Sequence, residues 1–262
     1  MTWQLNTCVT CCCLTPVLKS KALGFLSVLS LLPFFQHFQD DSPRDLAGAA
    51  AIQETMPSEL YQEDSEWLEA WLAAGIDQEV FVPYFQQLDN GQDGWRECFA
   101  SAAAMLAASA GLVDSDNEYI FHLAHYGDTT SVDAQLQTLR ALGLDVQFTQ
   151  EGNPQMIEEA ISRGSAVLVG WYDKGDTRRG EPPMCGGPAC GHWSVITGFQ
   201  GKRSPVGDQY WVMHDPMGYP LMEKGGHDKS RSGKSVRVRQ SEFNHRWLVD
   251  GPNSGWMITI SP

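Results

Sequence analysis

The spacing of apolar residues changes along the chain, from a helical period in its middle part to strand-like patterns in its second half. Helical spacing with start and stop signals, such as Ser131 before and Gly143 after one segment, predicts helices over residues 98–110, 117–126, 132–142 and 154–162. Short apolar runs predict strands over residues 80–85, 145–149, 166–171, 192–199, 209–214, 236–239 and 256–260. Helices followed by a mostly antiparallel sheet indicate the α+β class, with the N-terminal helices packed on the sheet.

The N-terminal part of the chain has a different pattern. Residues 22–35 form an apolar run that follows Lys19 and Lys21, and this run is too short for a stable membrane span of about 20 residues. It is typical of an export signal, and small residues at 47–51 offer a cleavage site. Two alternatives remain: a retained anchor or partner-binding helix, and a misassigned start with Met56 as the true one, which would leave a cytoplasmic protein.

These patterns divide the chain into three parts. Residues 1–55 are signal-like or disordered and lie outside the fold. Residues 56–79 contain an amphipathic helix, with Ser65 as its N-cap and Gly75 as its stop signal. Residues 80–262 form the main domain, and at 42% hydrophobic residues the chain can bury a sizeable core.

The charge of the chain excludes one class of partner. The formal net charge is -14, and the one basic stretch, residues 224–239, is typical of a solvated loop and strand face. A large interface with nucleic acid or an anionic membrane needs clustered Lys and Arg. We therefore expect no nucleic-acid partner.

The seven cysteines are unevenly distributed, and one of them stands out. Cys98 begins an Ala-rich apolar helix after a turn that contains Gly91 and Gly94. At a helix start, the dipole and the free backbone N–H groups favour a thiolate and an anion beside it. Only two other cysteines, Cys185 and Cys190, lie in the main domain, so the sequence predicts no disulfide framework.

Two groups of residues have spacings that permit metal binding. Cys185 and Cys190 lie just before His192, and a disulfide, free thiols and a zinc site remain open for them. His122 and His125 lie three apart on a predicted helix, a spacing more typical of an exposed helical face.

A thiol nucleophile needs a base and a group that orients the base. His192, at the start of a predicted buried strand, is the candidate base, and Asp215, at the end of the next strand, is the candidate orienting group. In strict antiparallel register we expect these two ends at separate edges, so the loop geometry must bring Asp215 back beside His192. His214 competes as the base, but strand alternation predicts that it faces away from Asp215.

The order of four sequence blocks resembles that of papain-like cysteine peptidases of the bacteriocin-processing, double-glycine leader type, in particular their stand-alone relatives. The blocks are residues 82–90, 98–106, 191–199 and 214–216. The resemblance implies a papain-like fold over roughly residues 80–260, with Cys98 as nucleophile, His192 as general base and acid, Asp215 as its orienting group and Gln87 as an oxyanion donor. Gln86 stands directly before Gln87 and is the alternative donor.

The sequence thus predicts a cysteine peptidase that cleaves an amide bond without a metal or an organic cofactor. Its partner would be a peptide, a protein or a peptidoglycan peptide. The chain has no transporter segment and no phosphate-binding loop of the Gly-x-x-x-x-Gly-Lys type, so leader processing does not follow from the resemblance. Two alternatives remain: a cell-wall amidase or endopeptidase that uses the same residues, and an inactive peptidase fold that serves as a binding module.

Overall fold

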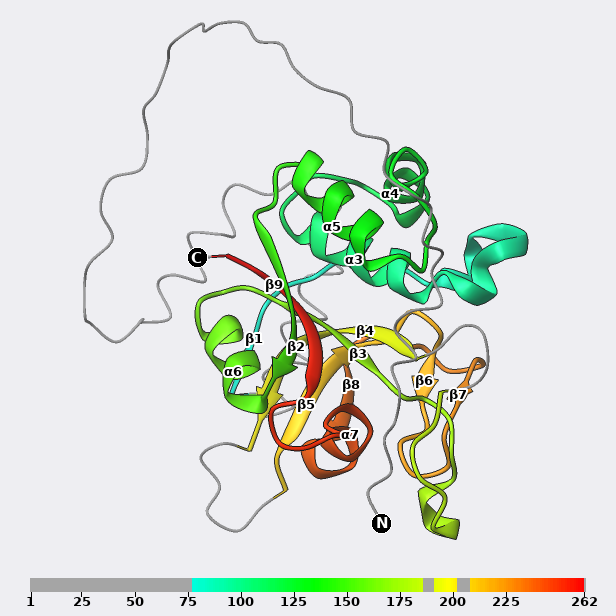
Figure 1. Ribbon diagram of the computed structural model, residues 1–262, viewed down its shortest axis with the longest axis vertical. Coiled ribbons are helices and arrows are strands. Elements are labelled where there is room, and N and C mark those ends of the chain that lie inside the picture. Colours follow the sequence, from blue (N-terminus) through cyan, green and yellow to red (C-terminus); the bar gives the residue numbers. More distant parts are fainter. Residues whose placement is uncertain (1–76, 186–190, 202–207, 262) are drawn as a thin grey trace, which may run out of the picture. The chain divides into compact units, whose positions relative to one another are not determined.

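The computed structural model describes residues 77–185, 191–201 and 208–261, and Figure 1 shows how their elements are arranged. The apolar run at residues 22–35 and the amphipathic helix expected before Gly75 lie outside these ranges. Among the described residues, no helix is both long enough and apolar enough to cross a bilayer.

One antiparallel sheet forms the centre of the described part. Its strands lie in the order β2-β9-β3-β4-β5-β8, and a short strand, β1, pairs with β4. All the strand pairs in this sheet are antiparallel, which confirms the α+β prediction. The strands are β1 (Gln78–Glu79), β2 (Val146–Gly152), β3 (Val167–Trp171), β4 (His192–Gln200), β5 (Tyr210–His214), β8 (Val236–Arg239) and β9 (Gly255–Ile260). A separate two-stranded pair joins β6 (Tyr219–Pro220) to β7 (His227–Asp228).

Five α-helices lie in the described ranges, and four of them occur where the apolar spacing predicts them. They are α3 (Cys98–Ser109), α4 (Asp116–Leu123), α5 (Val132–Ala141), α6 (Pro154–Ser162) and α7 (Gln240–Trp247). Helix α7 was not predicted, because its N-cap residue, Arg239, provides no side-chain cap and most of its surface is polar. The turn-rich segment before Cys98 forms two short 3-10 helices, η1 (Gln87–Asp89) and η2 (Gly91–Arg96), and a third, η3 (Thr177–Arg179), follows β3.

The strand predicted at residues 80–85 is wrong. Beyond Val80, whose N–H donates to Thr197 O at 2.7 Å, the segment makes no further strand of the sheet. Pro83 has no N–H to give to a ladder. The neighbouring residues make other contacts: Val82 O accepts a hydrogen bond from the His214 ring, and the Tyr84 hydroxyl donates to Asp215 O.

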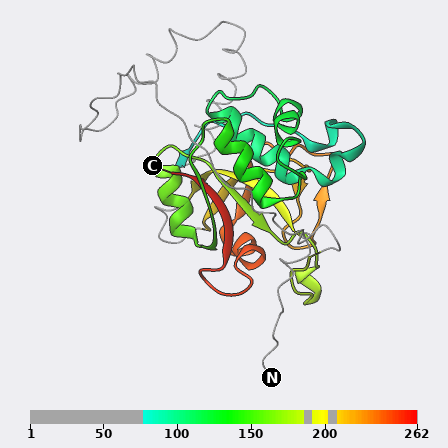
Figure 2. The same ribbon diagram turned by 45° about the horizontal axis from the view of Figure 1, so that its top comes forward.

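The sheet separates two hydrophobic clusters because side chains alternate along each strand. One face presents Leu168, Val195 and Ile258 to the layer of α3, α4 and α5. The other face presents, among others, Val169 and Met257 to the side of α6 and α7. Figures 1 and 2 show α3, α4 and α5 together on one side of the strands, with α6 and α7 on the other. Cys98 begins the helix that packs directly on the sheet.

Shortening Leu168 to alanine tests this packing. Leu168 is fully buried on the central strand β3, between β4 and β9. We expect Leu168→Ala to lower the free energy of unfolding by about 2–5 kcal/mol, because it leaves a cavity that the neighbours fill only in part. Urea unfolding followed by circular dichroism measures the loss. Val249→Ala, at a residue that is 40% exposed, is the control and should change stability by no more than about 0.5 kcal/mol. Equal losses in the two variants would contradict the proposed core.

Candidate active site

The start of β4 and the end of β5 lie at the same edge of the sheet. The expectation that strict register would separate them was wrong, because the first strand of an antiparallel hairpin starts beside the place where the second strand ends. Val195 pairs with His214 in the observed register, so Asp215 follows the pair at the level of Ser194. No return of the loop is needed to bring Asp215 towards His192.

His192 and Asp215 are joined by hydrogen bonds. The Nε2 atom of His192 lies 2.9 Å from each carboxylate oxygen of Asp215. Ser194, two residues along the same strand face, donates from Oγ to Asp215 Oδ2 at 2.9 Å. Trp171 in turn donates from Nε1 to Ser194 Oγ at 3.0 Å, and its ring meets the edge of the His192 ring. The Asp215 carboxylate and the Trp171 ring therefore both restrict the orientation of the His192 imidazole.

His214 points to the opposite face of β5. Its Nε2 donates to Val82 O at 3.0 Å, and its Nδ1 accepts from the N–H of Ser235 at 3.1 Å. Burial lowers the pKa of His214 to about 4, although its backbone hydrogen bonds oppose the shift. Because both ring nitrogens are occupied, this residue is not available as a base, as the alternation predicted.

Cys98 is brought to His192 by packing between their chain neighbours. The ring of Phe99 stacks on the ring of Trp193, with centroids 3.9 Å apart and planes 4° apart. Phe99 follows the cysteine on α3 and Trp193 follows the histidine on β4, so this stack fixes the helix start against the strand start. Cys98 lies close enough to His192 to raise the pKa of the imidazole, and its thiol is free and half-buried.

The helix start at Cys98 is suited to a thiolate. The N-cap residue, Glu97, makes no side-chain cap hydrogen bond, so its side chain does not occupy the free N–H groups of the first turn. Burial raises the pKa of Glu97, while a hydrogen bond from Asn90 opposes the rise.

The buried charges of His192 and Asp215 stabilise each other. Burial alone favours the neutral ring, but the Asp215 carboxylate and the Cys98 thiolate outweigh it and raise the pKa of His192 well above its usual value. Burial also disfavours the carboxylate, but His192 and His227 outweigh it and hold the pKa of Asp215 far below its usual range. The arrangement thus favours an imidazolium between two anions.

The backbone at Asp215 is fixed by Tyr84 and Gly233. The Tyr84 hydroxyl donates to Asp215 O at 3.1 Å and accepts from the N–H of Gly233 at 3.2 Å. The N–H of Asp215 donates to Gly233 O at 2.9 Å. A Cβ atom at position 233 would lie 1.9 Å from Asp215 O, so only glycine permits this approach.

Gln87, the candidate oxyanion donor, is fully buried. Its Nε2 donates to Gly94 O at 2.6 Å, and its backbone N–H donates to Pro216 O at 3.0 Å. These bonds join η1 to the turn before Cys98 and to the residue after Asp215. The amide carries two N–H groups, so one remains beside the bond to Gly94. Gln86 is only half-buried.

His227 is a site residue that the sequence did not reveal. Its Nε2 donates to Asp215 Oδ2 at 3.2 Å, its side chain is 3% exposed, and its ring centroid lies 4.4 Å from that of His192. It lies on the short strand β7, within the basic stretch interpreted as a solvated loop. No periodic pattern marks this position. Ser194, by contrast, was accessible from strand alternation, since it lies two residues after His192.

The two groups with metal-binding spacings gain no support as metal sites. The ring of His125, just after α4, makes contacts with backbone oxygens of that helix, at Phe121 and His122. Cys185 is disulfide-bonded, whereas Cys190 lies outside the described residues. A zinc site at these two cysteines therefore gains no support.

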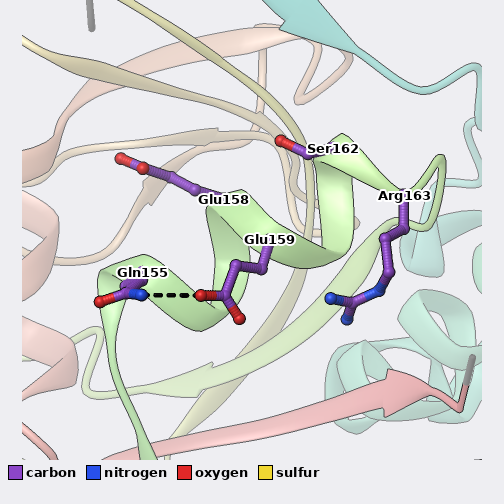
Figure 3. A pocket seen from close by; sticks show the side chains of 5 residues that line it. All are labelled: Gln155, Glu158, Glu159, Ser162 and Arg163. Carbon is purple, nitrogen blue, oxygen red and sulfur yellow. Dashed lines mark hydrogen bonds between the residues drawn. The ribbon is translucent and has the colours of Figure 1, made fainter. Parts of the chain in front are cut away.

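A hollow on the surface of α6 contains none of the candidate catalytic residues. Figure 3 shows the side chains around it, and Gln155 donates from Nε2 to Glu159 Oε1 at 2.7 Å across one helical turn. The lining residues all belong to α6 or directly follow it: Gln155, Glu158, Glu159, Ser162 and Arg163. A polar hollow along one helix lacks the convergent groups of a catalytic site.

Comparison with known proteins gives similar structures but no sequence match. No protein-family model matches the chain, and no curated protein gives a significant match. A putative C39-like peptidase from Bacillus anthracis is similar with a TM-score of 0.44 and 14% identity, over 71% of this chain and 98% of that one. A double glycine motif protease from an AMS/PCAT transporter, in complex with the leader peptide, has a TM-score of 0.42 and 15% identity over 71% and 96%.

A procathepsin L2 proteinase from the larval midgut of Tenebrio molitor is also similar, with a TM-score of 0.38 and 14% identity over 71% of this chain and 66% of that one. The C39-like peptidase and the double glycine motif protease are of the kind that the four sequence blocks resemble. Because the TM-scores and identities are low, the roles proposed below depend on the geometry of this chain.

The coupling between His192 and its two anionic neighbours can be measured directly. We expect Asp215→Asn to lower the pKa of His192 strongly, because burial then acts against a single remaining anion. Cys98→Ala should lower it less, since Asp215 contributes more to raising it. An NMR titration of the histidine ring signals measures both shifts, and the dispersion of the remaining signals shows whether each variant is folded. An unchanged His192 titration in folded Asp215→Asn protein would contradict the pairing.

Proposed function

We propose that the chain is a cysteine peptidase that hydrolyses an amide bond through Cys98, His192 and Asp215. The observation that supports this most strongly is the position of His192, whose buried ring is hydrogen-bonded to Asp215 through Nε2 and lies close enough to Cys98 for the thiol to raise its pKa. A nucleophile, a base and an orienting carboxylate in this order form the arrangement required for acyl transfer.

Attack begins with the thiolate of Cys98. Since Nε2 of His192 faces Asp215, Nδ1 is the ring nitrogen left to hold the thiol proton. The thiolate adds to the carbonyl carbon of the amide, and the electron pair of the C=O bond moves to oxygen. We assign the stabilisation of this oxyanion to the backbone N–H of Cys98 and to the second side-chain N–H of Gln87.

Collapse of this intermediate breaks the C–N bond. His192 gives the Nδ1 proton to the leaving amine, so that a neutral amine departs and a thioester remains on Cys98. His192 then takes a proton from water, the hydroxide adds to the thioester, and the acid is released as the thiolate re-forms. The carboxylate of Asp215 stays ionised throughout, and it keeps the ring oriented.

We propose that residues 80–262 are the catalytic domain and that the segments before them are appended to it. All four candidate residues, Gln87, Cys98, His192 and Asp215, lie within these limits.

We further propose that the protein is exported. The apolar run at residues 22–35 supports a signal function. The disulfide at Cys185 is consistent with it, because disulfides persist in oxidising compartments.

Replacing the nucleophile tests the proposed chemistry and its substrate class. The purified protein is incubated with a peptide library and, separately, with purified peptidoglycan, each beside Cys98→Ala. We expect peptide cleavage that falls on the order of 10⁴-fold or more in the variant, because the covalent step is lost. Mass spectrometry identifies the products, and thermal unfolding shows whether the variant is folded.

The other outcomes are equally informative. Cleavage of peptidoglycan but not of the library would replace the peptide substrate with the cell-wall alternative. Cys98→Ala protein as active as the parent would contradict Cys98 as the nucleophile. A parent inactive on both substrates would contradict the proposed peptidase and leave the inactive binding module.

The two adjacent glutamines provide a matched test of the oxyanion donor. We expect Gln87→Ala to lower kcat by about 10²–10³-fold, as the loss of one oxyanion donor does. Gln86→Ala is the control and should retain most of the activity. The rates are measured on the best peptide from the library at saturating concentration. If the larger loss occurred at Gln86, the two roles would be reversed.

A further inference from the structure

We propose that His192, Asp215 and His227 form a binding site for a divalent zinc-type metal ion, and that the bound ion switches the enzyme off. The binding site follows from the geometry of the three side chains alone. Only the inhibitory effect depends on the proposed peptidase function.

The three side chains offer the donor atoms that zinc prefers, at suitable separations. Nε2 of His192 lies 2.9 Å from Asp215 Oδ2, and Nε2 of His227 lies 3.2 Å from the same oxygen. One ligand atom from each residue lies within 4.8 Å of the other two. Zinc bonds to nitrogen and oxygen of about 2.0–2.1 Å place tetrahedral ligands roughly 3.3 Å apart. The hydrogen-bonded contacts are thus close to the edges of a zinc coordination polyhedron.

The ligands are held in place before any ion arrives. The carboxylate of Asp215 accepts hydrogen bonds from Ser194 Oγ and from the N–H of Met217, both at 2.9 Å. The Trp171 ring lies against both imidazoles, with centroids 5.4 Å from His192 and 5.9 Å from His227. A site whose ligands are already ordered loses little conformational entropy on binding.

The carboxylate of Asp173 lies near the second ring nitrogen of His227, where a metal-bound imidazole usually has a hydrogen-bond partner. Nδ1 of His227 lies 3.8 Å from Asp173 Oδ2, which is itself largely buried. Histidine ligands almost always give their second ring N–H to a carboxylate, a carbonyl or water, and this contact fixes the tautomer with a free lone pair for the metal. A small closure of the contact with Asp173 would leave Nε2 of His227 available for the ion.

Within the described ranges, no other group of three His, Cys, Asp or Glu side chains comes this close together. His122 on α4 and His125 just after it lack a third such ligand there. The ion is therefore expected at Asp215, beside the candidate base.

A metal on Nε2 of His192 would interrupt proton transfer at Cys98. The ion takes the Nε2 lone pair, and the proton held there moves to Nδ1 or is released to water. With its proton on Nδ1, the ring has no lone pair with which to accept a thiol proton. Giving that proton to a leaving amine would leave an imidazolate anion. Both proton transfers of the proposed cycle are therefore hindered.

Metal binding is tested in full-length Cys98→Ala protein, which needs no catalytic activity. The protein is stripped with a chelator, and Zn²⁺ is added in competition with a chelating indicator. We expect His227→Gln in this background to bind one ion fewer, or to bind it at least about tenfold more weakly. His245→Gln, at an exposed histidine of α7, is the matched control and should bind as the Cys98→Ala protein does. Comparing variants cancels any ion held elsewhere in the chain.

A second variant keeps the test decisive if His227→Gln does not fold. Asp173→Asn leaves all three ligands in place and should weaken binding by about 10–100-fold through loss of the outer carboxylate. Unchanged binding in the folded variants would overturn the site. So would a loss on going from parent to Cys98→Ala, which would place the ion at the thiol. A loss with His125→Gln would also overturn it, because it would place the ion at the C-terminal end of α4.

The inhibitory effect is measured separately, on the parent enzyme. We expect added Zn²⁺ to suppress peptide cleavage and a chelator to restore it. His227→Gln should need at least about tenfold more Zn²⁺ for half-inhibition of its own uninhibited rate. Zn²⁺ binding without inhibition would contradict the proposed inhibitory effect but not the binding site. A parent protein that binds Zn²⁺ but cleaves no peptide would contradict the proposed peptidase function, and the binding site would still stand.

Discussion

The arrangement of this site depends on one buried negative charge, that of Asp215. A carboxylate without solvent contact is costly unless hydrogen bonds and opposite charge replace its water. Here the replacements come from His192, His227, Ser194 and the N–H of Met217. Each of these bonds restricts the carboxylate, and the carboxylate in turn restricts the His192 ring. The energetic cost of burial thus enforces the orientation that a general base needs.

The antiparallel sheet brings these groups together without long excursions of the chain. A hairpin places the start of β4 beside the end of β5, and alternation puts His192, Ser194 and Asp215 on one face. The proposed nucleophile, Cys98, comes from a different layer, through the stack of Phe99 on Trp193. Because cysteine and histidine each precede one ring of this stack, a shift of α3 along the sheet would separate them. Core packing therefore determines the distance between thiol and base.

Local sequence patterns predicted many of the helices and strands, but they could not predict contacts between residues that are far apart in the sequence. Helix α6 begins where it was predicted because Asn153 caps it and Pro154 opens it. Helix α7 lacks such a cap and was not predicted. The strand predicted over residues 80–85 does not form, because Pro83 has no N–H to give to a neighbouring strand. The Tyr84 hydroxyl joins the backbone of Asp215 to that of Gly233, and both residues are far from Tyr84 in the sequence. His227 was missed for the same reason, since only the folded chain brings β7 to the end of β5.

The shared carboxylate has a consequence for the chemistry of both imidazoles. A proton between an imidazole nitrogen and a carboxylate oxygen occupies the position that a metal ion would occupy between the same two atoms. Where only one imidazole contacts the carboxylate, a proton is favoured over a metal ion at this position, because one nitrogen and one carboxylate bind zinc weakly. A second imidazole on the same oxygen completes a three-ligand set of the kind found in catalytic zinc sites. The same contacts that hold the proposed base, His192, in the tautomer required for catalysis therefore make it sensitive to metal, and His227 is the residue that creates this competition.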